Sequence, residues 1–275
     1  MSEWKGRTAL VTGASYGIGE AFARRLAADG ANVIVTARSS DRLDALAHEL
    51  RSNHGIEVTV IEADLADPAA PEEIFRATEA SGRQVDLLVN NAGFGAFGDF
   101  VDIPLRRQIE MIQVNVTALV VLSHLYLQPM IRRREGAIIQ LASTASFQGV
   151  PYSAIYAATK AFILNFSEGL WAECREHGVR VLALCPGPTA THFQAAAGTS
   201  HLRSLNKVKM QTAEEVVEVG LAALARSRSV AISGFSNQAM VAAERLVPRN
   251  LVTRLATRLF RPFSTRLQSG AVRGA

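Results

Sequence analysis

The stretch Thr12-Gly13-Ala14-Ser15-Tyr16-Gly17-Ile18-Gly19 places three glycines between a short apolar run and a segment of helical period. Glycine lets the backbone turn tightly and approach a ligand closely, and the N-terminus of a helix attracts negative charge. The sequence therefore predicts a phosphate-binding turn between a first strand and a first helix. The spacing differs from the G-x-G-x-x-G of the standard dinucleotide fingerprint, so an ordinary tight turn is the alternative at this point.

Short apolar runs alternate with longer segments of helical period along most of the chain. Strands and helices that alternate in this way form a parallel sheet with crossover helices. The predicted strands are Ala9–Thr12, Asn32–Thr36, Glu57–Glu62, Leu87–Asn90, Ala137–Leu141, Arg180–Leu184 and Val230–Ile232. The predicted helices are Gly19–Asp29, Ser40–His54, Pro71–Ala80, Pro104–Arg133, Ala154–His177 and Ala213–Ala225. We therefore expect a single α/β domain with a doubly wound, seven-stranded parallel sheet and helices on both faces.

The composition is that of an ordinary globular protein. Hydrophobic residues make up 48% of the 275 residues and charged residues 20%, which excludes a disordered or fibrous class. Cys174 and Cys185 have no metal-like spacing, so we expect neither a metal site nor a disulfide framework, and a cytoplasmic location fits best. The N-terminus shows no apolar signal region. The apolar stretch 117–131 contains His124 and Pro129 and is too short to span a bilayer, so it is predicted to be a buried helix.

Positive charge is concentrated in the C-terminal tail. The formal net charge is +4, and the residues after 237 include Arg245, Arg249, Arg254, Arg258, Arg261, Arg266 and Arg273 against Glu244 alone. We therefore divide the chain into a domain, 1–237, and a basic extension, 238–275. Since the basic patch of a nucleic-acid-binding domain belongs to the domain itself, we expect no nucleic-acid partner.

The extension is predicted to form a basic amphipathic helix. Its arginines alternate with apolar residues at Leu251, Val252, Leu255, Leu259 and Phe260. Such a helix packs on its own domain or a second subunit, which is the preferred interpretation, or it contacts an acidic membrane surface.

The second predicted strand is followed by Ala37, Arg38 and Ser39, about twenty residues after the glycine turn, where an acidic residue would bind the adenosine ribose of NAD. Arg38 instead suits the 2′-phosphate of NADP, because a guanidinium binds phosphate through two parallel hydrogen bonds. A plain surface arginine is the alternative. Asp64, after the third predicted strand, is a candidate partner of the adenine amine or simply part of a turn.

Tyr156 and Lys160 have the four-residue spacing that places two side chains on one face of a helix. A nearby ammonium favours the phenolate, so the pair predicts a tyrosine with a lowered pKa that transfers a proton near working pH. Taken alone, the pair fits equally well a half-buried aromatic beside a lysine stem. Ser143 follows the fifth predicted strand, and Asn115 lies in an apolar helical run where its amide needs a hydrogen-bond partner.

Together these residues resemble the short-chain dehydrogenase/reductase family over residues 5–235, in its NADP-dependent type. The resemblance covers the T-G-x-x-x-G-x-G turn at 12–19, the N-N-A-G motif at 90–93 and the P-G segment at 186–191. It implies a Rossmann fold with Asn115, Ser143, Tyr156 and Lys160 as catalytic residues. It also implies NADP contacts from Gly13, Ser15, Tyr16, Gly17, Ile18, Gly19, Arg38, Ser39, Asp64, Leu65, Asn91, Ala92, Gly93, Tyr156, Lys160, Pro186, Gly187, Thr189 and Thr191.

The resemblance implies hydride transfer between the nicotinamide and a ketone or secondary alcohol, with Tyr156 exchanging the proton. Lys160 would lower the tyrosine pKa and bind the nicotinamide ribose, and Asn115 would hold a water. A 3-oxoacyl thioester reductase whose tail contacts a membrane or a carrier is one alternative, and a non-catalytic NADP-binding scaffold is another. The resemblance further implies a homodimer or homotetramer, formed through the helices at 104–133 and 154–177.

Two segments are candidates for shaping a substrate pocket. Phe94 and Phe97 lie among glycines after the fourth predicted strand and either line an apolar pocket, which we favour, or anchor a loop. Tyr152 either lines the same pocket or packs in the core. The segment 186–210 is predicted to be a long loop that shapes the site.

Overall fold

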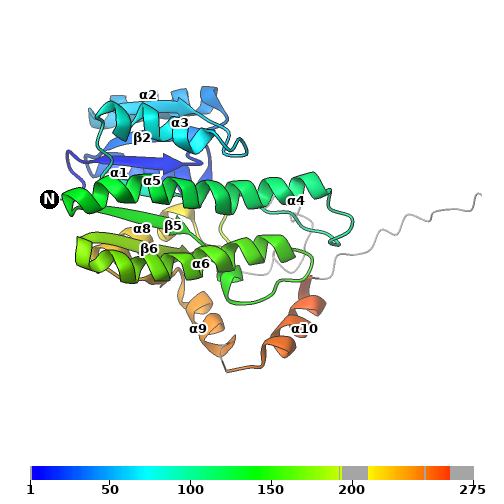
Figure 1. Ribbon diagram of the computed structural model, residues 1–275. Coiled ribbons are helices and arrows are strands. Elements are labelled where there is room, and N and C mark those ends of the chain that lie inside the picture. The colour runs from blue at the N-terminus through cyan, green and yellow to red at the C-terminus, as the bar shows by residue number, and fades with distance from the viewer. Residues whose placement is uncertain (1, 192, 194–209, 245, 261–275) are drawn as a thin grey trace, which may run out of the picture.

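The computed structural model describes residues 2–191, 193, 210–244 and 246–260, and it contains one seven-stranded sheet (Figure 1). The strands are β1 (Thr8–Thr12), β2 (Asn32–Ala37), β3 (Val58–Glu62), β4 (Leu87–Asn90), β5 (Gly136–Leu141), β6 (Val179–Cys185) and β7 (Val230–Ile232). Their order is β3-β2-β1-β4-β5-β6-β7, and every neighbouring pair is parallel. The predicted Rossmann-type sheet is therefore confirmed.

Helices connect consecutive strands, as parallel pairing requires. The α-helices are α1 (Gly17–Ala28), α2 (Ser40–His54), α3 (Ala70–Ala77), α4 (Leu105–Ile112), α5 (Ala118–Arg133), α6 (Ala154–Cys174), α8 (Ala213–Ala225), α9 (Phe235–Glu244) and α10 (Arg249–Phe260). Shorter helical turns are η1 (Glu79–Ser81), η2 (Gln113–Thr117), η3 (Thr144–Phe147) and η4 (Arg175–His177). The six predicted helices are all present, with ends that differ by a few residues.

The core has two layers because alternate strand residues point to opposite faces of the sheet. Along β1, Ala9 and Val11 belong to the cluster that contains Phe22 of α1 and Val216 of α8. Leu10 between them belongs to the opposite cluster, which contains Tyr126 of α5. Both faces of the sheet are covered, which explains why its strands are nearly continuous apolar runs.

The predicted helix 104–133 is one long helix with an irregular centre. α4 and α5 are joined by η2, a π-helical turn, so the helix runs continuously from Leu105 to Arg133 over 29 residues. By length and composition it is long enough to cross a membrane, so the expectation from 117–131 that it is too short was wrong. Half of its most apolar window is nevertheless buried inside the domain, where Leu122 and Tyr126 pack on the sheet. It is a core helix, as predicted.

The extension forms two helices below the carboxyl part of the sheet (Figure 1). The predicted boundary after residue 237 lies inside α9, whose Asn237 donates to the Ser233 carbonyl oxygen at 2.7 Å and whose Val241 is buried. The division of the chain into a domain and an extension at this residue stays a prediction. α10 is a helix within the predicted extension, and residues 261–275 of the extension, which include Arg261, Arg266 and Arg273, lie outside the described part of the chain.

α10 packs on its own domain. Ala256 is buried, and Thr253 lies against the loop at Gly149, where a β-carbon would be 3.5 Å from the threonine hydroxyl. Leu251 and Leu255 point away and are 46% and 55% exposed. The preferred interpretation of the extension, packing on protein, therefore holds for one face of this helix and not for the other.

Candidate active site

The candidate site residues lie at one edge of the sheet. The glycine turn follows β1, and Arg38 and Ser39 follow β2. Asp64 and Leu65 follow β3. The 91–93 segment follows β4, Ser143 follows β5, and the 186–191 segment follows β6. In a parallel sheet all these points are carboxyl ends of strands, the edge at which open α/β sheets bind ligands.

The glycine turn is held in shape by the N-N-A-G segment. The Asn91 side chain donates to the carbonyl oxygens of Thr12 at 2.8 Å and Gly13 at 3.2 Å. In return the Thr12 hydroxyl accepts the backbone N–H groups of Asn91 and Ala92, each at 3.0 Å. These four bonds fasten the turn after β1 to the segment after β4, which explains why both motifs occur in one chain.

All three glycines of the turn have conformations or neighbours that a side chain would disturb, and Gly13 and Gly19 show this most clearly. Gly13 has φ +66°, in the left-handed region that favours glycine. At Gly19 a β-carbon would be 2.4 Å from both the Asn91 amide nitrogen and the Gly13 carbonyl oxygen. The turn thus presents bare backbone at the start of α1, a helix of 12 residues whose first amide groups are free to bind an anion. These residues fit the pyrophosphate of a dinucleotide.

The edge after β2 carries two arginines. Arg38 is exposed, and no hydrogen bond or ion pair of its side chain is found within the described ranges. Arg42, on the first turn of α2, donates to the Ser15 carbonyl oxygen at 3.1 Å and stacks on the Tyr16 ring at 3.8 Å. Sequence reasoning missed Arg42, although its spacing of four from Arg38 at the start of a predicted helix was a usable signal.

The edge after β3 is a tight turn. The Asp64 carboxylate accepts the backbone N–H of Ala66 at 3.0 Å, and Leu65 is buried in the core. This is the turn interpretation that the sequence left open for Asp64. Its proposed contact with the adenine stays a prediction.

The Ser143 hydroxyl lies within hydrogen-bonding reach of Tyr156 and lowers the pKa of that phenol. Ser143 is extended at the start of η3, and its hydroxyl accepts the Ala145 backbone N–H at 3.1 Å, which leaves the hydroxyl proton free to be donated. Burial raises the pKa of Tyr156 to about 12, and the bond with Ser143 opposes this rise. The expected lowering of the tyrosine pKa by Lys160 is therefore not found in this arrangement.

Lys160 is buried beside the tyrosine but bonded elsewhere. Its ammonium lies 5.8 Å from the centre of the Tyr156 ring and donates to the Leu141 carbonyl oxygen at 2.6 Å. Burial lowers the pKa of Lys160 to about 8, and the Cys185 thiol opposes this. The lysine therefore titrates near working pH, which an exposed lysine does not.

Asn115 lies in η2 and is fully buried, with its amide hydrogen-bonded as the sequence required. It exchanges two bonds of 3.0 Å with the backbone of Phe94 and donates to the Thr159 hydroxyl at 3.1 Å. A β-carbon on Gly93 would be 3.0 Å from the Asn115 oxygen and 3.6 Å from the Lys160 ammonium. Asn115 and Lys160 thus lie on either side of Gly93, where the resemblance implies that Asn115 holds a water.

Comparison with known proteins agrees with this geometry. The family described as short chain dehydrogenase matches residues 7–202. The chain belongs to the short-chain dehydrogenase/reductase family. It is accordingly an oxidoreductase of alcohols and ketones that uses a nicotinamide dinucleotide.

Three similar proteins illustrate the relationship. The 7beta-hydroxysteroid dehydrogenase of Collinsella aerofaciens is 32% identical over 240 residues, covering 86% of this chain and 90% of the relative. A short-chain dehydrogenase from Sphingobium yanoikuyae, solved in complex with NADPH, superposes with a TM-score of 0.80 at 32% identity, covering 90% of this chain and 95% of the other. The bulky-bulky ketone specific alcohol dehydrogenase from Comamonas testosteroni gives a TM-score of 0.74 at 29% identity, covering 90% and 94%.

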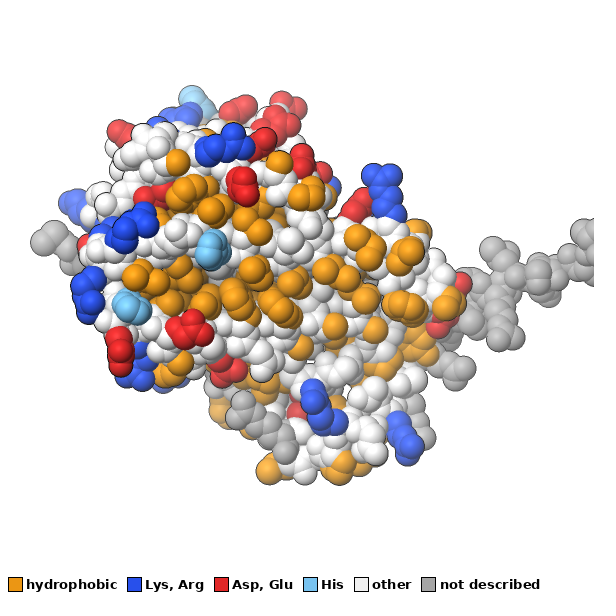
Figure 2. Space-filling view, viewed as in Figure 1, with side chains coloured by type: hydrophobic (Ala, Val, Ile, Leu, Met, Phe, Trp, Pro, Cys, Tyr) orange, Lys and Arg blue, Asp and Glu red, His pale blue; other side chains and the backbone are white. Residues whose placement is uncertain are grey.

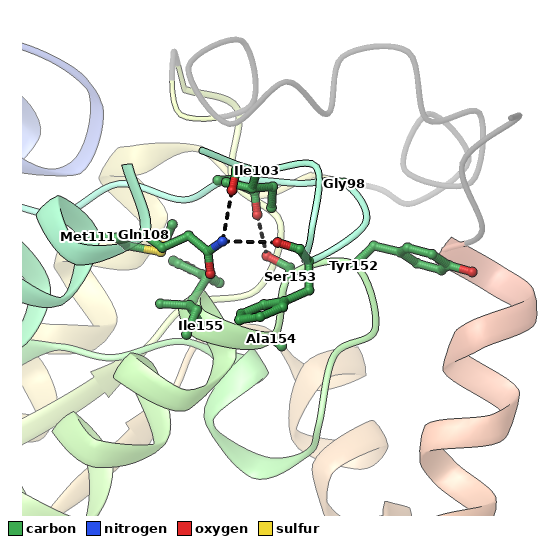
Figure 3. A pocket seen from close by; sticks show the side chains of 11 residues that line it. Gly98, Ile103, Gln108, Met111, Tyr152, Ser153, Ala154 and Ile155 are labelled. Atoms are coloured by element: carbon green, nitrogen blue, oxygen red, sulfur yellow. Dashed lines mark hydrogen bonds between the residues drawn. The ribbon is translucent and has the colours of Figure 1, made fainter. Parts of the chain in front are cut away.

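The substrate side of this dehydrogenase contains an apolar pocket that Tyr156 helps to line, and Figure 3 shows part of its wall. Its lining residues are Ala96, Gly98, Phe100, Ile103, Gln108, Met111, Tyr152, Ser153, Ala154, Ile155 and Tyr156. The Gln108 amide donates to the backbone carbonyls of Phe100 and Ile103, and Ser153 donates to that of Ala96. Since these donors are bonded to the pocket wall, the space that Tyr156 helps to line is largely apolar.

The aromatic residues predicted to line the pocket have other contacts. Phe94 lies under the Arg107 guanidinium at 4.6 Å, and Phe97 packs on Tyr152 with ring centres 6.0 Å apart. Neither side chain lines the pocket, so they anchor the loop, and Phe100 takes the predicted role. Figure 3 shows the Tyr152 ring turned away from the pocket toward α10, although the residue contributes to the lining.

The segment after β6, residues 186–191, contacts both the turn after Ser143 and the glycine turn after β1. The Pro186 carbonyl oxygen accepts the Thr144 backbone N–H at 2.9 Å, and Gly187 lies against the Asn237 side chain. Thr189 forms a bridge with Gln211, and the Thr191 methyl group lies where a β-carbon on Gly17 would be. Residues 192 and 194–209 of the predicted loop lie outside the described part of the chain.

Three further residues near the catalytic groups were missed by sequence reasoning. Ser146 and Thr159 are buried and bonded to the backbone at Lys160 and Tyr156, respectively. Phe193 packs on the Tyr156 ring with centres 5.4 Å apart. Thr159 had a signal, as a polar neighbour of Lys160 in an apolar helix, whereas Ser146 and Phe193 become recognisable only once β5, α6 and the segment after β6 are brought together.

Proposed function

We propose that this dehydrogenase catalyses NADP(H)-dependent interconversion of an apolar ketone and its secondary alcohol, with Tyr156 as the proton donor and acceptor. One observation carries the proposal: Tyr156, whose pKa the neighbouring Ser143 hydroxyl lowers, is also one of the residues that line the apolar pocket. A carbonyl oxygen held there meets two hydroxyl donors where negative charge develops.

The nicotinamide, when bound, supplies or accepts the hydride. The chain's own residues orient the substrate oxygen and move the proton. Ser143 and Tyr156 orient the substrate oxygen, and Tyr156 gives it a proton in the direction of reduction. Lys160 is the candidate that replenishes this proton, because its pKa of about 8 allows it to exchange protons near working pH. Asn115 and Gly93 flank the ammonium and are the candidates for holding a water beside it.

The preference for NADP rests on the edge after β2. This edge presents Arg38, whose guanidinium is exposed and has no bond to any residue that the structure describes, and Arg42 four residues later. No acidic residue stands at 37–39 to bind a free ribose hydroxyl. Two arginines on this edge and no acidic residue at 37–39 favour a phosphate.

The substrate class rests on the pocket wall. Its donors are bonded to the chain itself, so the wall gives a substrate apolar contact and little hydrogen bonding. The relatives include an enzyme for hydroxysteroids and one for bulky ketones, which agrees with a rigid apolar molecule bearing a single reactive oxygen. The alternatives are a 3-oxoacyl thioester reductase and a non-catalytic NADP-binding scaffold.

The decisive experiment follows NADPH oxidation against steroid ketones, bulky aromatic ketones and 3-oxoacyl thioesters. We expect the ketones to be the better substrates, and Tyr156→Phe to lower kcat by about 10²–10⁴ while NADPH still binds. A preference for thioesters would select the first alternative. Absence of turnover with any of them would favour the scaffold, and full activity of the phenylalanine variant would remove the proton-donor assignment.

Cofactor choice is tested by comparing the dissociation constants of NADPH and NADH. We expect tighter binding of NADPH, and we expect Arg38→Ala to remove most of the difference. Arg132→Ala is a matched control, because Arg132 is exposed near the end of α5, which leads to the opposite edge of the sheet. Equal affinity of the unchanged protein for both cofactors would contradict the argument from Arg38.

A homodimer or homotetramer is proposed to form through α4 and α6. Leu105, Ile109 and Ile112 form an exposed apolar stripe along α4, and Phe162 of α6 is also exposed. Figure 2 shows apolar side chains gathered on the face that these helices and α5 present. Light scattering should give a dimer or tetramer that Ile109→Glu dissociates and Leu246→Glu, at an exposed residue after α9, leaves intact; a monomeric parent protein would contradict this.

The outward face of α10 supports a peripheral membrane contact as a secondary proposal. Leu251 and Leu255 are exposed beside Arg254, a combination suited to anionic headgroups. Sedimentation with anionic liposomes, with and without residues 243–275, tests it, and equal sedimentation of both would remove it. The cytoplasmic location is likewise proposed and would be tested by fractionating cells that express the chain.

A further inference from the structure

Ser146 links the two chain segments that carry the candidate catalytic groups. Its hydroxyl is buried in η3 and accepts the Ser143 backbone N–H at 3.2 Å. The same hydroxyl donates to the Lys160 carbonyl oxygen at 2.8 Å. Since a carbonyl oxygen can only accept, the direction of both bonds is fixed. One buried side chain therefore ties the end of β5 to the turn of α6 that bears Lys160.

This link does not depend on where the lysine ammonium points. The ammonium donates to the Leu141 carbonyl oxygen through one of its N–H groups, and its other N–H groups can take different partners. The bond from Ser146 holds the Lys160 backbone instead, so it persists when the side chain changes partner. Tyr156 lies about one helical turn before Lys160, so holding the backbone there also fixes the tyrosine relative to Ser143.

We propose that Ser146 is a positioning residue, which holds Ser143 and the Tyr156–Lys160 turn of α6 at the separation at which the serine and tyrosine hydroxyls hydrogen-bond. The proposal rests on the proposed function, because the reaction uses that pair of hydroxyls. Ser146 is not among the residues that line the described pocket, so it acts through its neighbours and not by touching substrate.

The electrostatic consequence of loosening this link has a definite sign. The bond from Ser143 is the contribution that lowers the Tyr156 pKa against the effect of burial. Among the described residues, the other titratable groups facing this part of the site are Lys160 on α6 and Cys185 at the end of β6, both buried. Replacing Ser146 removes neither of them. A longer Ser143–Tyr156 bond would therefore raise the Tyr156 pKa.

The test compares Ser146→Ala with Ser167→Ala. Ser167 is a matched control, because it is also buried and its hydroxyl donates to a carbonyl oxygen of α6, that of Ile163 at 2.6 Å, away from the catalytic groups. In Ser146→Ala we expect kcat to fall about tenfold to a hundredfold, the loss typical of a misplaced catalytic group, with the KM for NADPH little changed. The pH midpoint of alcohol oxidation, which needs the phenolate, should move upward.

A second readout does not require turnover. The chain has four tyrosines, so ring ¹³C NMR of tyrosine-labelled protein gives few signals, and Tyr156→Phe identifies the one from Tyr156. Ser146→Ala should shift that signal and its titration, Ser167→Ala should leave both unchanged, and Ser146→Thr, which keeps a hydroxyl, should restore them. This measurement separates failure of the positioning role from failure of the proposed reaction.

Two results would overturn the proposal. One is a Tyr156 signal that is the same in Ser146→Ala as in the unchanged protein. The other is a fall in kcat with an unshifted pH midpoint that Ser167→Ala reproduces, since that would make Ser146 an ordinary buried hydroxyl.

Discussion

The cofactor end and the substrate end of the site are built in different ways. At the cofactor end, the Thr12 and Gly13 carbonyl oxygens accept bonds from the Asn91 side chain, and the Thr12 hydroxyl accepts the Ala92 backbone N–H. These bonds lie between strands that are buried on both faces. At the substrate end, the wall is made by loop residues such as Phe100, which is 58% exposed, next to a loop that contacts α10. The cofactor end is therefore part of the core, whereas the substrate end is formed by loops attached to the core.

The difference teaches which changes the molecule tolerates. A change in the glycine turn must move backbone that is packed and bonded on all sides, so it affects folding and cofactor binding together. A change in the pocket wall removes a half-exposed side chain and affects the fit of a substrate while the fold stays intact. Three measurements bear on this comparison.

The largest effect is expected from Gly19→Ala. Its β-carbon would be 2.4 Å from two atoms of the bonded turn, so we expect the free energy of unfolding to fall by about 3 kcal/mol or more, with loss of NADPH binding. Urea unfolding and cofactor titration measure both. Gly169→Ala, at a helical position of α6 with open space around the α-carbon, is the control and should be neutral or slightly stabilising. Equal behaviour of the two variants would break the comparison.

An intermediate effect is expected at Lys160, where the two ends meet. Its pKa is lowered by burial from 10.5 to about 8, so between these values the unfolded state binds the proton and the native state does not. The contribution of Lys160 to stability therefore rises as pH increases through this window. The stability gained by Lys160→Met over the unchanged protein should shrink by about 2 kcal/mol between pH 8 and 10, measured by urea unfolding. A gain independent of pH would show that the lysine is not held uncharged.

The smallest effect on the fold is expected from Phe100→Ala. Because the ring is more than half exposed, unfolding should change by less than about 0.5 kcal/mol. Loss of its apolar contact should lower kcat/KM for a bulky ketone about fivefold and leave a small ketone unaffected. Val101→Ala, at an exposed neighbour that does not line the described pocket, is the control. A large loss of stability in Phe100→Ala would show that the pocket wall contributes to the stability of the core.

Sequence patterns predicted the cofactor end better than the substrate end. The glycine turn, Asn91 and the tyrosine–lysine pair are local motifs, and local spacing survives folding because strands and helices have fixed periods. The prediction that Phe94 and Phe97 line the pocket was wrong, since both pack into the loop. Phe100 lines the pocket instead. Which side chain of an irregular loop faces a cavity depends on contacts that have no period.

The tyrosine pKa shows the same limit. The spacing of Tyr156 and Lys160 predicted that the ammonium lowers the phenol pKa. In the fold, both groups are buried and the ammonium bonds the Leu141 carbonyl oxygen, so burial dominates and the tyrosine pKa rises. The four-residue spacing places Tyr156 and Lys160 on one helix face. The partner of the ammonium, the Leu141 carbonyl oxygen, comes from β5 and could not be read from that spacing.

The sequence by itself determined the alternation of strands and helices, the turn after β1 and the polar residues at the ends of the strands, because these follow from local conformation and apolar period. Only the tertiary structure decided what those residues touch. It brought Asn91 to the glycine turn, Arg42 to Tyr16 and Ser146 to the backbone of Lys160. These contacts join residues that are far apart in the chain, and they exist because parallel strands bring all their carboxyl ends to one edge of the sheet.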